Sequence, residues 1–265
     1  MLEPLKSGPD LIREIDETLT ATPTLWWLGH SGFIVRFANI TFYIDPCLSE
    51  RPGKLRRGAS PLDASQIRHA DMILATHAHP GHLDPATVLP MLEASPNAKL
   101  VIPRTVQAQA HAAGIPYNRM TTTDSGLRIE YFKGNLYSRI YAIPSAHPIL
   151  DKNPSDGYPY LGYLLRFGRW TIYHAGDCAA YPELAAHLRP FNVNVALLPI
   201  GDSNFSVSEA AQLAADIGAR WLVPMHYQTF NEDRESEFVT HLLGHRPEQR
   251  FQVFQCGQRW TVPEE

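Results

Sequence analysis

The chain has 265 residues, 44% of them hydrophobic and 19% charged, so it can bury a full core. Its formal net charge of -4 gives it no general electrostatic reason to bind nucleic acid or an anionic membrane. No apolar run reaches the ~18 residues of a spanning helix, and the acidic first 22 residues lack the apolar block of a secretory signal. Three cysteines, far apart and odd in number, argue against a disulfide framework and favour a reducing cytoplasm.

A short amphipathic helix is predicted near the N-terminus, where apolar residues recur at helical spacing: Leu11, Ile12, Ile15 and Leu19. Ser7 can cap this segment, with Pro9 and Asp10 in its first turn. We expect a helical extension over residues 1–23 that packs on the outside of a single domain, residues 1–265.

Three strands with short connections are predicted next, at 25–28, 33–37 and 40–44, and they form an antiparallel meander. Residues 47–70 are irregular and hold a basic cluster: Arg51, Lys54, Arg56 and Arg57. This cluster is either solvated surface or a rim that attracts an anionic substrate.

The rest of the chain alternates strands and helices. Strands are predicted at 72–75, 99–102, 128–132, 136–143, 160–167, 170–173, 193–198 and 221–225. Helices are predicted at 85–94, 105–113, 182–188, 206–217 and 232–243, and a closing strand pair at 251–254 and 259–262. Because each half carries strands and then helices, we expect two sheets packed face to face with helices outside.

Three histidines crowd into the loop that follows the strand at 72–75. His77 and His79 have the spacing that puts two side chains on one side of an extended segment. A tight turn at Pro80 and Gly81 can bring His82 back toward the same point. Imidazole is the commonest metal-binding side chain, so this loop predicts a metal site, and the alternative is a polar surface loop.

Metal-binding residue types also follow three later strands: His147, Asp177 and His226. Strand ends that gather at one edge of a sheet are where α/β folds build their sites. Together with the loop histidines, these residues supply five imidazoles and one carboxylate, enough for two metal ions that share a bridging group.

The chain resembles the metallo-β-lactamase-fold superfamily of metal-dependent hydrolases, and within it the branch of ascorbate-6-phosphate lactonase-like enzymes. The matching segments occur in the expected order: 28–33, 44–46, 76–84, 173–177, 196–201 and 224–227. The resemblance implies an α/β fold, a four-layer αββα sandwich. It also implies that His77, His79 and His147 bind a first metal ion and that His82 and His226 bind a second. Asp177 is implied as the carboxylate that bridges the two ions.

The implied function is hydrolysis of a lactone or phosphoester-type small substrate by a metal-bound hydroxide, with Asp177 and His226 as catalytic residues. His30 either contacts the substrate or has only a structural role in its turn, and Tyr227 is a further candidate for substrate contact. The expected cofactor is one or two divalent ions, zinc first, with manganese and iron as alternatives. We expect a small-molecule substrate, no nucleic-acid or membrane partner, and a cytoplasmic location; the sequence carries no signal for an oligomeric state.

One position departs from the resembled loop pattern, His-x-His-x-Asp-His, because Gly81 stands where that pattern has Asp. We therefore expect a tight first metal site and a weak or altered second site. Asp84 either replaces the missing ligand or holds a histidine ring in place. The departure also leaves two alternatives open: a catalytically impaired metal-binding or ligand-sensing protein, and a phosphodiesterase or nuclease. Five further histidines, at 69, 111, 187, 241 and 245, are expected to be solvated, and the resemblance gives His174 no ligand role.

Overall fold

The structure is a computed structural model that describes residues 3–49, 58–155, 157–201, 203–227 and 234–264. The predicted basic cluster at Arg51 to Arg57 lies outside these residues. The chain divides into two compact units, Met1–Thr122 with Phe254–Glu265, and Thr123–Val253. Each unit is built on a seven-stranded sheet. In the described ranges, no helix has both the length and the hydropathy needed to span a bilayer.

The sheet of the first unit combines the predicted meander with parallel strands. In sheet order its strands are β14 (Arg259–Thr261), β1 (Thr24–Gly29), β2 (Gly32–Phe37), β3 (Ile40–Ile44), β4 (Met72–Leu74), β5 (Lys99–Pro103) and β6 (Met120–Thr123). β1, β2 and β3 are antiparallel, as predicted, whereas β3, β4 and β5 are parallel. β6 was not predicted, since its Met-Thr-Thr-Thr sequence lacks the apolar run that indicates a buried strand.

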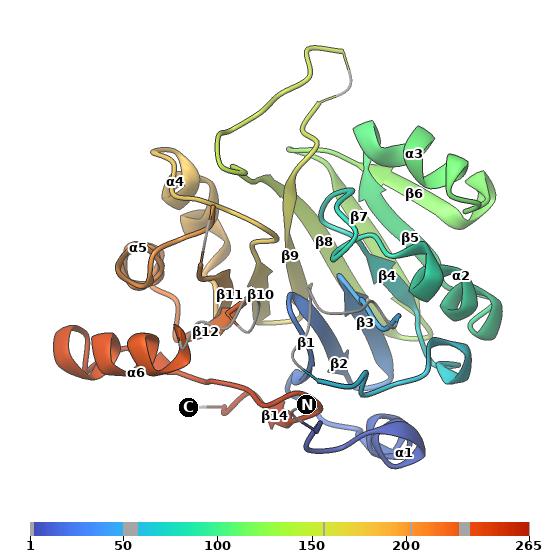
Figure 1. The fold of residues 1–265 in the computed structure, drawn as a ribbon, viewed down its shortest axis with the longest axis horizontal. Helices are drawn as coiled ribbons and strands as arrows, with labels where there is room; N and C mark the ends of the chain where they lie inside the picture. Colours follow the sequence, from blue (N-terminus) through green and yellow to red (C-terminus); the bar gives the residue numbers. More distant parts are fainter. Residues whose placement is uncertain (1–2, 50–57, 156, 202, 228–233, 265) are drawn as a thin grey trace. The chain divides into compact units, whose positions relative to one another are not determined.

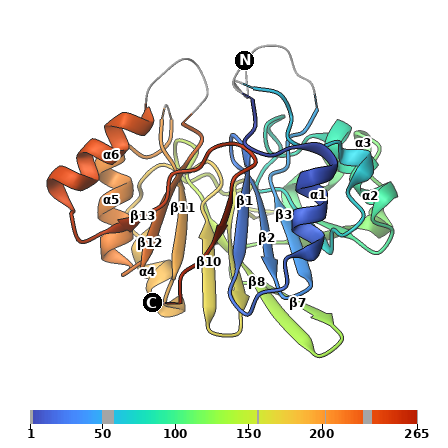
Figure 2. The same ribbon diagram turned by 90° about the horizontal axis from the view of Figure 1, so that it is seen from below.

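Three helices lie on one face of this sheet: α1 (Gly8–Glu17), α2 (Pro85–Ala94) and α3 (Gln107–Ala112) (Figure 2). Alternate strand residues on that face, including Trp26, Ile34 and Tyr43, join a buried core with Leu11 and Ile15 of α1. Period-two alternation explains the pattern, because residues two apart on a strand point to the same face. Strands β1 and β3 are buried along their whole length.

Helix α1 is held to its sheet by polar contacts as well as by the core. The Arg36 guanidinium on β2 donates to the carbonyl of Thr18 at 2.7 Å and to that of Asp16 at 3.2 Å. These bonds satisfy carbonyl groups that the end of a helix leaves without intrahelical partners. At the other end, Ser7 precedes the helix as predicted, but its side chain makes no capping hydrogen bond.

The sheet of the second unit has the order β13 (Arg250–Phe251), β12 (Trp221–Met225), β11 (Val195–Pro199), β10 (Trp170–His174), β9 (Leu161–Phe167), β8 (Leu136–Pro144) and β7 (Arg128–Lys133). β7 to β10 are antiparallel and β10 to β13 are parallel. Its helices lie on one face of this sheet (Figure 1): α4 (Leu184–Leu188), α5 (Val207–Asp216) and α6 (Arg234–His245). The predicted capping box of α5 is present, with Ser206 and Glu209 bonded to each other's backbone.

The prediction that the last two strands, at 251–254 and 259–262, pair with each other is wrong. β13 pairs with β12, whereas β14 pairs with β1 in the sheet of the other unit. The residue pattern indicates that a segment is extended but does not say which neighbour supplies its hydrogen bonds. Four short 3-10 turns complete the described structure, at Ala64–Gln66, Arg104–Val106, Tyr117–Arg119 and Arg189–Phe191.

The burial of α1 gives a direct stability test. Leu11 is fully buried, whereas Leu19, from the same predicted stripe, is 70% exposed. We expect Leu11→Ala to lower the free energy of unfolding by about 2–5 kcal/mol, because it leaves a cavity in the core. Leu19→Ala is the matched control and should change it by less than about 0.5 kcal/mol. Urea denaturation of both variants measures the difference, and equal effects would contradict the docking of α1.

Candidate metal centre

The histidine loop of the first unit begins where two parallel strands end side by side. Ile44 at the end of β3 is in register with Leu74 at the end of β4. The next residues therefore meet, and the backbone N–H of Thr76 donates to Asp45 Oδ1 at 2.7 Å. The N–H of Asp45 donates in turn to the carbonyl of Leu74 at 2.8 Å. This pairing holds the start of the loop against the end of β3.

Asp45 also orients one of the predicted ligands. Its Oδ2 lies 2.7 Å from His82 Nδ1 and accepts a hydrogen bond from the Thr76 hydroxyl at 2.7 Å, and all three residues are buried. A carboxylate at Nδ1 favours the tautomer with its proton there, which makes Nε2 the nitrogen that can bind a metal. Sequence reasoning missed this role, although an acidic residue directly after a buried strand was a usable signal.

The loop brings its three histidines together, as predicted. His77 Nε2 faces His79 Nδ1 at 3.0 Å, and the rings of His77 and His82 have centroids 3.9 Å apart. The turn between them is closed by the N–H of His82, which donates to the carbonyl of His79 at 2.9 Å. His77 and His82 are buried, whereas His79 is exposed, so the cluster reaches solvent on one side.

In the second unit, three strand ends meet at one edge of the sheet. β9 is antiparallel to both β8 and β10, and β10 to β12 are parallel, so β8, β10 and β12 all run in the same direction. The residues that follow these strands are therefore neighbours: His147, Asp177 and His226. The Ala179 N–H donates to the Ala146 carbonyl at 2.7 Å and joins two of the loops.

The distances around Asp177 fit a metal better than a hydrogen bond. Asp177 Oδ2 lies 3.7 Å from His147 Nε2, and Asp177 Oδ1 lies 3.5 Å from His226 Nε2. Good hydrogen bonds are about 2.7–3.2 Å long. Two ligand atoms about 2.0–2.1 Å from one tetrahedral ion are about 3.4 Å apart. Each oxygen of this buried carboxylate faces a different imidazole, and this donor set fits a metal role.

Left-handed backbone occurs at three of these residues, two in the first unit and one in the second. Asp45 has φ 45°, His226 has φ 67° and His30 has φ 53°. This conformation costs a non-glycine residue about 1–3 kcal/mol, and such strain clusters at functional sites.

Tyr227, Cys178 and Asp84 are all buried. The substrate contact predicted for Tyr227 stays a prediction. Burial raises the pKa of the Cys178 thiol to about 12, so the thiol is protonated at neutral pH and is not a nucleophile. Asp84 Oδ2 accepts a hydrogen bond from the Thr87 hydroxyl at 2.6 Å, which ties it to α2, and both roles predicted for Asp84 stay predictions. The three cysteines form no disulfide within the described structure.

His69 is not solvated, and that prediction is wrong. The hydroxyl of Tyr43 lies 2.6 Å from His69 Nε2, and Asp16 Oδ1 lies 2.8 Å from His69 Nδ1. Burial lowers the pKa of His69 below its ordinary value, with Asp16 opposing that effect. This burial was not predictable from the residue pattern, because His69 belongs to an irregular segment without periodicity.

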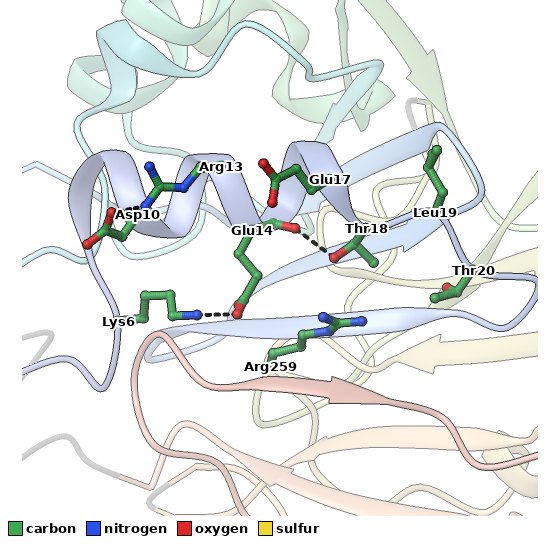
Figure 3. A pocket seen from close by; sticks show the side chains of 9 residues that line it. All are labelled: Lys6, Asp10, Arg13, Glu14, Glu17, Thr18, Leu19, Thr20 and Arg259. Carbon is green, nitrogen blue, oxygen red and sulfur yellow. Dashed lines mark hydrogen bonds and ion pairs between the residues drawn. The ribbon is translucent and has the colours of Figure 1, made fainter.

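A pocket of about 650 Å³ lies beside α1 in the first unit (Figure 3). Two ion pairs lie among its lining residues: Lys6 pairs with Glu14, and Arg13 with Asp10. It contains neither a histidine nor any of the predicted ligands. The pocket is therefore a feature of how α1 packs and is separate from the candidate metal centre.

Comparison with known proteins identifies the class. The family described as "Beta-lactamase superfamily domain" matches residues 41–227. A UPF0173 metal-dependent hydrolase from Caldivirga maquilingensis is 29% identical over 243 residues, which cover 90% of this chain and 98% of the relative. A UPF0173 protein from Pyrococcus furiosus is 31% identical over 221 residues, 83% of this chain and 90% of the relative. The solved structure of a metallo hydrolase from Ignicoccus hospitalis has TM-score 0.73 at 22% identity, and the match covers 92% of this chain and 100% of that one.

The family match, together with the two mixed sheets and their helices, places the chain in the β-lactamase superfamily. Within that superfamily, the chain belongs to the UPF0173 metal-dependent hydrolase family. The predicted fold class and the prediction of an enzyme are confirmed. The narrower ascorbate-6-phosphate lactonase-like branch stays a prediction.

The contacts of Asp45 predict an indirect effect on metal binding. Asp45→Asn keeps the size of the side chain but removes the charge that favours the Nδ1–H tautomer of His82. Such partners of metal ligands are worth about 10–100-fold in metal affinity, so we expect a loss of that size. Competition with a chromogenic chelator measures the affinity. An affinity equal to that of the wild type would show that Asp45 serves only the backbone of the loop.

The lowered pKa of His69 predicts a pH-dependent stability. The unfolded chain binds a proton at an ordinary pKa of about 6.5, whereas the folded chain resists protonation, so acid favours unfolding. The stabilising contribution is fully present above that value and is lost as the pH falls below it toward the lowered folded pKa. We expect chelator-treated wild type to lose more stability between pH 7.5 and 5.5 than equally treated His69→Gln. Urea midpoints at both pH values test this, and parallel losses would contradict it.

Proposed function

We propose that the predicted ligands bind one or two divalent ions and that the protein hydrolyses a small lactone or phosphoester-type substrate. The proposed ligands are those that the sequence singled out: His77, His79, His82, His147, Asp177 and His226. The main support for the proposal is the position of the buried Asp177 carboxylate, whose two oxygens each face the Nε2 atom of a different histidine.

The first unit supports the proposal independently. Its loop brings His77 Nε2 and His79 Nδ1 to a hydrogen-bond distance of 3.0 Å, so the two imidazoles lie side by side, and it orients His82 through Asp45. An arrangement of imidazoles with a carboxylate behind one of them is typical of metal-binding histidines. Imidazole and carboxylate ligands suit zinc, manganese and iron, and we propose zinc because five of the six ligands are imidazoles.

Divalent ions held by these residues would lower the pKa of a water molecule and polarise a carbonyl or phosphoryl oxygen. The chain's own contribution is to position these groups. Asp177 would fix the spacing of the ligand sets and can accept a hydrogen bond from the attacking water. His226 directly follows β12, so the end of that strand positions its imidazole. Tyr227, next to His226, is proposed to contact the substrate.

We propose that the substrate is anionic, because the sequence contains a cluster of cationic residues. Four cationic residues lie within residues 51–57, at Arg51, Lys54, Arg56 and Arg57, in a protein whose net charge is -4. A local cationic segment on an acidic protein can raise the local concentration of an anion. We propose a phosphorylated lactone or a phosphoester on this ground, and a cytoplasmic setting for the reaction.

A second candidate function is supported by Gly81. The loop lacks a carboxylate at this position, so the protein could bind metal for ligand sensing without turnover. A panel of lactones and phosphoesters, assayed with Zn²⁺, Mn²⁺ and Fe²⁺, distinguishes the two. Turnover of any member supports hydrolysis, whereas tight substrate binding without turnover supports sensing.

Substitutions of the proposed ligands test the assignment. We expect Asp177→Asn and His147→Ala to lower both metal content and kcat/KM by more than about 100-fold, since even indirect partners of ligands cost 10–100-fold. Chelation of the wild type should abolish turnover, and added zinc should restore it. Metal content is measured by elemental analysis of dialysed protein.

His187→Ala is the control for these variants, because His187 is an exposed histidine at the end of α4. It should keep the metal content and activity of the wild type. If Asp177→Asn also kept both, the carboxylate would not be a ligand and the proposed function would be wrong.

A further inference from the structure

Gly81 lies against the imidazole of His30. A β-carbon on residue 81 would be 2.8 Å from His30 Cε1, 3.3 Å from Nδ1 and 3.4 Å from Nε2. A contact of 2.8 Å is closer than carbon atoms can approach, so any larger residue would have to move the ring. Gly81 is absent from the residues with positive φ, so its backbone does not require glycine. Glycine fits at position 81 because the His30 ring occupies the space that a side chain would need.

The His30 ring also lies at a suitable distance from a predicted ligand. The centroids of His30 and His82 are 5.0 Å apart, with the ring planes at 69°. A tetrahedral ion about 2.0–2.1 Å from one nitrogen of each of two imidazoles would put their centroids about 5 Å apart. Asp45 already holds Nδ1 of His82, which directs the other nitrogen of that ring to a ligand role.

The turn that carries His30 is held in an unfavourable conformation. Gly29 and Gly32 pair across the two-residue turn between β1 and β2, and His30 has φ 53° within it. The first position of such a turn usually has glycine or asparagine, because a β-carbon is strained there. The Trp27 indole N–H donates to the His30 carbonyl at 3.0 Å and stabilises the turn. A buried imidazole kept at this position despite the strain indicates a role for the ring.

We propose that His30 is a metal ligand of the second site, where it takes the place of the side chain that Gly81 lacks. This inference rests on the proposed function and adds His30 to the second-metal set, beside His82 in the first unit. An imidazole in place of a carboxylate removes one negative charge from that set. The change favours ions that prefer nitrogen ligands, so zinc should bind there far better than manganese.

Four proteins test the proposal: the wild type, His30→Gly, Gly81→Asp, and the double variant. Glycine at position 30 tolerates the positive φ and removes only the ring. Zinc titration calorimetry should show two equivalents for the wild type. In His30→Gly the first should persist, and the second should weaken by about 100-fold or more, since even indirect partners of ligands cost 10–100-fold.

Two rescue experiments separate a ligand from a structural residue. Added imidazole should restore the second equivalent in His30→Gly, because it can occupy the vacated position. Gly81→Asp alone should also weaken the second site, since its side chain collides with His30. The double variant should bind the second ion more tightly than either single variant, because the new carboxylate then has room.

Ala38→Gly is the matched control, because Ala38 also has left-handed backbone, with φ 50°, in the neighbouring turn. It should keep both equivalents. In the wild type, the NMR signal of a ¹⁵N-labelled ring nitrogen of His30 should change its chemical shift when the second zinc equivalent is added. This measurement tests the inference without any substitution.

Two equivalents of unchanged affinity in His30→Gly would overturn the inference, as would a single equivalent in the wild type. Both results would leave the proposed function in place, since they concern the second ion alone. A wild type that binds no zinc would overturn the inference and the proposed function together.

Discussion

A single buried carboxylate, Asp45, organises the histidine loop of this protein. It stands at the end of β3, bonds the backbone and hydroxyl of Thr76, and lies against Nδ1 of His82. The parallel pairing of β3 with β4 makes these contacts possible, because it ends the two strands side by side. One carboxyl group therefore links the hydrogen bonding of the sheet to the orientation of the His82 ring. Its burial is tolerated because its oxygens have partners of good geometry.

In the second unit, the ends of three strands position the candidate ligand residues. The common direction of β8, β10 and β12 delivers His147, Asp177 and His226 to one edge, so residues separated by about 80 positions become neighbours. Asp177 is central there, since its two oxygens face two different imidazoles. The left-handed backbone of His226 shows that the placement of this residue carries a conformational cost.

Many elements were predictable because their signals are local. The meander at β1 to β3, the helix at Pro85–Ala94 and the capping box at Ser206 all follow from periodicity, turn residues and spacing. The failures share a different cause. β6 is too polar to be recognised, β13 and β14 were paired with each other although they join different sheets, and His69 was expected in solvent although it packs on Tyr43. Each depends on a partner that is distant in the chain.

The sequence by itself determined the element types, the histidine loop, the later strand-end residues and, through a recognisable order of motifs, the class of metal-dependent hydrolase. These properties are carried by residue identity and short-range spacing. Only the tertiary structure decided that Asp45 supports His82, and that the His30 ring fills the space beside Gly81. Both depend on contacts across 37 and 51 residues, respectively. Such contacts exist only after the chain has folded, because the pairing of strands sets which side chains meet.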